Sequence, residues 1–98
     1  MIIPIDFDET YTEDPELWNT FIRKAQTNGH RVICVTARYN EGKRQTTNND
    51  DIFKSIGTVI DHDEIYFSGI AAKRNYMINE HEIYPHVWID DTPLGIVE

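Results

Sequence analysis

Two pairs of carboxylates, each directly after an apolar run, are the side chains of this sequence best suited to chemistry. The first pair is Asp6 and Asp8, and the second is Asp90 and Asp91. In an extended chain alternate side chains share one side, so Asp6 and Asp8 can face one region while Phe7 faces the core. Carboxylate oxygens are the ligands of hard divalent cations, and acids that converge would form a cation site. Taken alone, each pair also fits the start of a solvated turn.

Two other polar side chains hold matching positions after the other predicted strands. Thr36 closes the apolar run that starts at Val32, and Lys73 follows the short apolar run at residues 65–67. In open α/β sheets, reactive groups gather beyond the carboxyl ends of the strands, near the point where the strand order reverses. Alone, Thr36 also fits a strand end or a helix cap, and Lys73 also fits a solvated helix residue.

A parallel sheet is needed to bring these side chains together, and the hydrophobic pattern predicts one. The second strand is apolar through its middle rather than alternating, as expected when helices cover both faces of a sheet. Right-handed crossovers then give a three-layer, Rossmann-like α/β domain with a short parallel sheet in the order 3-2-1-4. Strands are predicted at residues 2–8, 31–36, 65–67 and 86–89, and helices between Asp14 and Asn28, within residues 41–57 and at 71–78.

Pro4 disagrees with this strand order. A proline has no N–H to donate to a sheet ladder, yet the order places Pro4 in an inner strand.

Length and composition limit the classes of protein that fit. The 98 residues make a single domain, and 40% hydrophobic and 27% charged residues are ordinary globular values. The net charge of -8 disfavours broad coating of nucleic acid, whose phosphates carry the same sign. No apolar run is as long as a membrane-spanning helix, and Met1 leads into apolar residues without a basic leader. We therefore expect a cytoplasmic protein without a membrane partner, and an inert buried thiol at Cys34.

Taken in chain order, the polar residues resemble the four motifs of the haloacid dehalogenase-like superfamily. Those motifs are DxDx(T/V) after the first strand, Thr or Ser after the second, a later Lys, and an acidic pair after the fourth. The ordered set is more specific than any of its members. The resemblance covers nearly the whole chain and implies a magnesium-dependent phosphohydrolase of one domain, residues 1–98. The matching residues are Asp6, Asp8 and Thr10, then Thr36, then Lys73, then Asp90 and Asp91.

The resemblance implies a catalytic role for four residues. Asp6 would attack the phosphorus in line and form an aspartyl-phosphate. Asp8 would protonate the leaving oxygen and then take a proton from the water that cleaves the intermediate. Thr36 would donate its hydroxyl to a phosphoryl oxygen, and Lys73 would balance the charge of the nucleophile and the phosphoryl group. The substrate would be a phosphorylated small molecule or the exposed phosphate end of a larger one.

The resemblance also implies a Mg²⁺ cofactor. Its ligands would come from Asp6, from Asp90 and from the backbone carbonyl of Asp8, with waters and phosphate completing the octahedron. Asp91 would be a further ligand, directly or through a water.

A cationic cluster of Arg38, Lys43 and Arg44 follows the second predicted strand in an otherwise acidic chain. The cluster lies near the expected phosphate site, which favours binding of a second anionic group, such as another phosphate of a nucleotide or the end of a nucleic-acid strand. A solvated loop is the other interpretation. Arg38 therefore joins Thr36 and Lys73 as a candidate substrate-binding residue.

No cap domain fits into the chain. The stretch from Asp8 to Thr36 is used up by one helix and one strand, and Ser68 to Lys73 leaves only a short turn. In the family, such a bare site resembles that of enzymes that act on large or protruding substrates or that borrow a lid from a second subunit. The further helix and strand of larger relatives are also absent, which leaves one edge less covered, and a homodimer through that edge is a further expectation.

Three other functions compete with hydrolysis. A non-catalytic descendant would keep the fold and bind Mg²⁺ or a phosphorylated partner. A phospho-receiver domain would carry its phosphorylated Asp at the third strand, which is followed here by Ser68 and Gly69. A metal-dependent nuclease could use the same acids, but it would leave Thr36 and Lys73 without a role.

Overall fold

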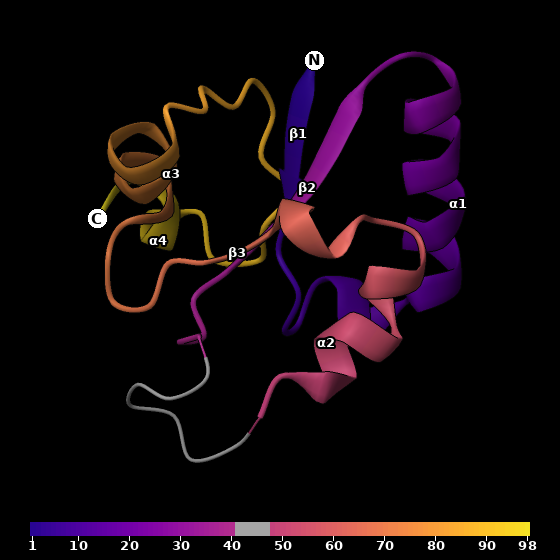
Figure 1. Ribbon diagram of the computed structural model, residues 1–98, viewed down its shortest axis with the longest axis horizontal. Coiled ribbons are helices and arrows are strands. Elements are labelled where there is room, and N and C mark those ends of the chain that lie inside the picture. Colours follow the sequence, from indigo (N-terminus) through magenta and orange to yellow (C-terminus); the bar gives the residue numbers. More distant parts are fainter. Residues whose placement is uncertain (41–47) are drawn as a thin grey trace.

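The structure, a computed structural model, describes residues 1–40 and 48–98, and three parallel strands form its centre (Figure 1). In space the strands follow the order β1-β2-β3, with β2 in the middle. The predicted α/β class with a parallel sheet is confirmed. The strands are β1 (Ile2–Ile5), β2 (Arg31–Thr36) and β3 (Ile65–Phe67).

Helices lie on both sides of this sheet. α1 is on one side, and α3 and α4 are on the other (Figure 1). The carboxyl ends of the strands are left open between these outer layers, which is where a site is expected in such folds. The helices are α1 (Pro15–Thr27), α2 (Asp50–Lys54), α3 (Lys73–His81) and α4 (Leu94–Val97), with 3₁₀ turns at Tyr11–Glu13, Ile56–Thr58 and His62–Glu64.

Side chains of β2 alternate between two hydrophobic cores, one on each face of the sheet. Val32 and Cys34 belong to the core that includes Ile22 of α1. Ile33 belongs to the second core, which includes Met77 of α3. Because both faces are covered, every position from Val32 onwards in this strand is buried, which explains its uninterrupted apolar sequence.

α1 begins and ends where the sequence predicts. Asp14 caps the helix, because its Oδ1 accepts the backbone N–H of Leu17 at 3.1 Å. Pro15 occupies the first turn, where its missing N–H is not needed. The helix stops before Asn28, and Gly29 follows with a φ of 87°, a conformation that glycine adopts without strain.

β1 is shorter than predicted because the chain turns at its end. The strand stops at Ile5 rather than at residue 8. The carbonyl of Asp6 accepts the N–H of Tyr11 at 3.3 Å, and the carbonyl of Phe7 accepts the N–H of Thr12 at 3.2 Å. These bonds fold residues 6–10 into a compact loop over the end of the strand.

The later helices differ from the prediction at their ends. α2 begins only at Asp50, and the predicted helical stretch at 41–47 lies outside the described residues. α3 begins at Lys73 rather than at residue 71, and it continues to His81 before Glu82 ends it with a φ of 54°. α4 has no counterpart among the predicted elements.

The predicted fourth strand is reduced to an isolated bridge, in which Ile89 lies parallel to Ile5. The N–H of Ile89 donates to the carbonyl of Pro4 at 3.0 Å, and the N–H of Asp6 donates to the carbonyl of Ile89 at 2.9 Å. In this register a regular ladder would need an N–H on Pro4 to bond the carbonyl of Val87, and proline has none. The sheet therefore has three strands, and the expected order 3-2-1-4 is present only as far as 3-2-1.

Within the described residues, the structure contains no helix of the length and apolarity required to span a membrane.

The buried face of β2 provides a test of the packing. Ile33 is 0% exposed, whereas Leu17 on the outer side of α1 is 54% exposed. We expect Ile33→Ala to lower the free energy of unfolding by about 2–5 kcal/mol, because it removes buried methyl groups and leaves a cavity. Leu17→Ala, the same kind of truncation at the surface, should change it by no more than about 0.5 kcal/mol. Urea denaturation measures both, and equal losses in the two variants would contradict this description of the core.

Candidate active site

Three carboxylates converge at the carboxyl end of β1. One oxygen from each of Asp6, Asp90 and Asp91 lies within 4.8 Å of the others. The backbone bond from the N–H of Asp6 to the carbonyl of Ile89 places Asp90 directly beside the end of β1. The fold thus brings together three of the four residues predicted to hold a metal, from opposite ends of the chain.

Lys73 bridges two of these acids. Its Nζ donates to Oδ1 of Asp6 at 2.8 Å and to Oδ2 of Asp90 at 2.6 Å, and the residue is only 5% exposed. Because Lys73 is the first residue of α3, the start of this helix sets where the ammonium group lies. The structure therefore places Lys73 beside the acids, in the position that the sequence order predicts.

Thr10 ties the first loop to the acidic pair near the C-terminus. Its hydroxyl donates to Oδ1 of Asp91 at 3.0 Å and accepts the backbone N–H of Asp91 at 3.1 Å, with Oδ2 of Asp6 at 3.5 Å. The carbonyl of Thr10 is held in turn by Nε1 of Trp18 at 3.0 Å. Thr10 belongs to the sequence motif but not to the predicted site residues. Its spacing of four residues from Asp6 is the feature of the sequence that could have placed it in the site.

Burial and neighbouring charges shift the ionisation of this cluster. Loss of solvent raises the pKa of Asp6 to about 6, although Lys73 opposes the shift. A hydrogen bond with Asp6 holds the pKa of Asp91 below its ordinary value. Burial alone would lower the pKa of Lys73, but its bonds to Asp6 and Asp90 outweigh burial and keep that pKa above the ordinary value. Lys73 is therefore a permanent cation at neutral pH.

The charges and donor atoms of the cluster fit a divalent cation. With all three carboxylates ionised, the single ammonium group of Lys73 leaves two negative charges uncompensated around one point. Carboxylate oxygens suit hard cations such as Mg²⁺, and they also accept Mn²⁺ and Ca²⁺. Asp6, Asp90 and Asp91 would supply the side-chain ligands, so the residues fit the expected metal without being specific to it.

The carboxylate of Asp8 is not among the three that converge, and it pairs with Arg38 instead. Nε and Nη2 of Arg38 each donate to Asp8 at 2.8 Å, while Nη1 and Nη2 donate to Asp51 at 2.8 Å. The guanidinium also lies over the ring of Phe7, 5.2 Å from its centre. The side chain of Asp8 is 51% exposed, so this pairing is at the surface.

Thr36 ends β2 as predicted, and its hydroxyl is bonded to the backbone of Arg38. The residue is 1% exposed, and its Oγ1 accepts the N–H of Arg38 at 3.3 Å. Its neighbour Ala37, rather than Thr36, lines the pocket at the acids. Of the predicted catalytic residues, Asp6 and Lys73 are therefore in contact, while Asp8 and Thr36 are engaged with Arg38.

The acids open into a pocket of about 350 Å³. Asp6, Asp8, Lys73, Asp90 and Asp91 all contribute to its wall. Asp8 thus borders the same space as the acids even though its carboxylate is held by Arg38. Two other residues of the predicted cationic cluster, Lys43 and Arg44, lie outside the described residues.

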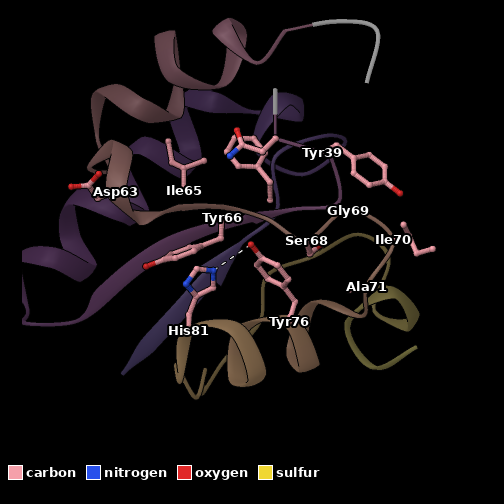
Figure 2. Close-up of a pocket in the computed structure, with 12 residues that line it drawn as sticks. Tyr39, Asp63, Ile65, Tyr66, Ser68, Gly69, Ile70, Ala71, Tyr76 and His81 are labelled. Carbon is pink, nitrogen blue, oxygen red and sulfur yellow. Dashed lines mark hydrogen bonds between the residues drawn. The ribbon is translucent and has the colours of Figure 1, made fainter. Parts of the chain in front are cut away.

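A short turn separates this pocket from a larger one. The N–H of Ser68 donates to the carbonyl of Thr36 at 2.9 Å, and the N–H of Ala71 donates to the carbonyl of Ser68 at 3.2 Å. The second pocket, of about 570 Å³, lies between β3 and α3 (Figure 2).

No protein-family model, no curated protein and no solved structure matches this chain.

The buried ammonium group offers a direct test of the site's electrostatics. Without added metal, we expect Lys73→Met to lower the free energy of unfolding by about 3–5 kcal/mol, because it leaves Asp6 and Asp90 buried without a counter-charge. Lys24→Met, on the exposed side of α1, is the matched control and should stay within about 0.5 kcal/mol of the parent. Urea denaturation in the presence of a chelator measures both variants. A Lys73→Met protein as stable as the control would show that the bridge contributes little.

Proposed function

We propose that this chain is a Mg²⁺-dependent phosphohydrolase of the haloacid dehalogenase-like class, which cleaves phosphomonoesters through an aspartyl-phosphate on Asp6. The observation that carries the proposal is the cluster of Asp6, Asp90 and Asp91 with Lys73 bridging two of the three. These residues come from three separate segments, in the order that the resemblance requires. A solvated turn would explain each acid alone, but it would not explain a buried lysine aimed at two of them.

In this proposal Asp6 supplies the nucleophile. An oxygen of its carboxylate attacks the phosphorus, a new P–O bond forms, and the bond from phosphorus to the leaving oxygen breaks. Water then attacks the same phosphorus, which releases phosphate and restores Asp6. Lys73 lies 2.8 Å from the nucleophile and stabilises the negative charge that the phosphoryl group brings. The bound cation would shield the phosphoryl oxygens from the surrounding carboxylates.

Asp8 is the group that would move the protons. As an acid it gives a proton to the leaving oxygen, and as a base it takes one from the attacking water. Its carboxylate is half-exposed and borders the pocket, so a change of its side-chain torsions away from Arg38 brings it to the leaving group. The hydroxyl of Thr36 accepts the N–H of Arg38 and keeps its own proton, which it would donate to a phosphoryl oxygen. Arg38 would remain paired with Asp51 when Asp8 leaves it.

A non-catalytic module that binds Mg²⁺ and phosphate is the second candidate. It is favoured by the two bonds that hold Asp8 on Arg38 and by the burial of Thr36, which is 1% exposed. Such a module would bind the cation at the same acids but would not turn over a phosphomonoester.

Hydrolysis is tested with a generic aryl phosphate. We expect the purified chain to release phosphate when Mg²⁺ is present and to stop when the metal is chelated. Asp6→Asn keeps the shape of the side chain but removes the nucleophile, so it should lower the rate by more than about 10³-fold. Asp61→Asn, an exposed acid away from the pocket, is the control and should keep its activity within about twofold.

Two outcomes of this assay would count against the mechanism. Full turnover by Asp6→Asn would remove the covalent step, and hydrolysis of phosphodiesters in preference to monoesters would favour a nuclease. Folded, Mg²⁺-binding protein without any turnover would favour the non-catalytic module.

Metal binding is tested separately from turnover. Since a ligand that binds only the folded state stabilises it, Mg²⁺ at about 100 times its Kd should add about 2.7 kcal/mol to the free energy of unfolding. We expect Asp90→Asn to remove most of this increment, because it takes a charge from the cluster. Asp61→Asn should retain it. Thermal unfolding followed by circular dichroism, with and without Mg²⁺, makes the measurement, and an equal increment in both variants would place the cation elsewhere.

A further inference from the structure

The larger pocket has no part in the proposed phosphoryl chemistry. It lies between the outer edge of β3 and the helix α3, and its volume is about 570 Å³ (Figure 2). Tyr39 and Ile70 lie at one end of it and Asp63 at the other, with Tyr66, His81 and Tyr76 between them (Figure 2).

This pocket adjoins the pocket at the acids across the short turn between them. Gly69, Ile70 and Ala71 line both. A phosphomonoester whose phosphate lies at Asp6 therefore has its leaving group beside this short turn, next to the larger pocket.

Aromatic rings form much of the wall. The ring of His81 lies 4.7 Å from that of Tyr66 and 5.2 Å from that of Tyr76, centre to centre, and both pairs meet edge to face. The hydroxyl of Tyr76 is 3.3 Å from Nε2 of His81 (Figure 2). Where the two pockets meet, the ring of Tyr39 packs so closely on Gly69 that an added Cβ would come within 2.8 Å of it. Planar aromatic ligands bind to such surfaces by stacking.

The charge of the wall selects against an anionic group. Among the described lining residues there is no lysine and no arginine, and Asp63 is the acid. Asp63 and the hydroxyl of Ser68 offer hydrogen-bond acceptors. The pocket therefore suits a neutral, planar group that carries N–H or O–H donors, and a second phosphate would not suit it.

We propose that this pocket binds the base of a nucleoside monophosphate, whose phosphate lies at the acids and whose sugar crosses residues 69–71. The inference rests on the proposed phosphohydrolase function and names its substrate class. It places the recognition of a nucleotide on an aromatic pocket rather than on Arg38, whose guanidinium is already shared by Asp8 and Asp51.

The kinetic test compares two substrates that differ only by the base. With Mg²⁺ present, we expect kcat/KM for adenosine 5′-monophosphate to exceed that for ribose 5-phosphate by about tenfold or more, the size of stacking on one aromatic ring. Tyr76→Ala should raise KM for the nucleotide and remove this preference. Tyr76→Phe keeps the ring and should keep the preference. Equal kcat/KM for the two substrates, or a preference that survives Tyr76→Ala, would overturn the inference.

A binding test separates this inference from the proposed function. Adenosine, which has no phosphate, is titrated into the Asp6→Asn protein, and NMR follows the rings of Tyr66, Tyr76 and His81. Saturable shifts of these resonances support the pocket even if no phosphate is ever released, in which case only the proposed hydrolysis fails. Phosphate release by the parent protein without any such shifts overturns the pocket and leaves hydrolysis standing. Shifts that depend on protein concentration rather than on adenosine would identify the pocket as a contact between copies of the chain, and would overturn the inference as well.

Discussion

An ammonium group between two buried carboxylates is the contact on which this part of the molecule depends. Asp6 ends β1, Asp90 lies in the last segment, and Lys73 begins α3, so two hydrogen bonds join three distant stretches of the chain. Carboxylates that are removed from water are stable only when a counter-charge and hydrogen bonds compensate them. The same lysine supplies the counter-charge and the hydrogen bonds. It therefore holds the start of α3 against the sheet and also compensates the charge of the acids.

The elements that sequence reasoning predicted well are those whose signals are local. β2 is recognisable because both of its faces are covered, and α1 because Asp14 and Gly29 mark its two ends. The meeting of Asp6 with the acids of the last segment followed from a general rule, that the strands of a parallel sheet end at one edge. These features need no knowledge of individual side-chain contacts.

Other features depend on partners far away in the sequence, and the pattern does not contain them. Arg38 could have faced solvent or a phosphate, yet it is shared between Asp8 and Asp51, thirty and thirteen residues away. Thr36 ends its strand as expected, but its hydroxyl accepts the backbone N–H of Arg38, a contact that the apolar pattern of the strand does not contain. Such choices are settled by packing and pairing in the finished fold, so composition and periodicity leave them open.

The proline in β1 determines how the end of the chain is attached. Backbone hydrogen bonds join the last segment to Ile2 and to the end of β1, on either side of Val87. The ladder bond that would lie between them is missing. Beyond Ile89 the attachment continues through side chains, with Thr10 holding Asp91 and Lys73 holding Asp90. Ionised side chains therefore contribute to holding the C-terminal part of the protein in place. β2 and β3, in contrast, are joined by the backbone ladder of a parallel pair.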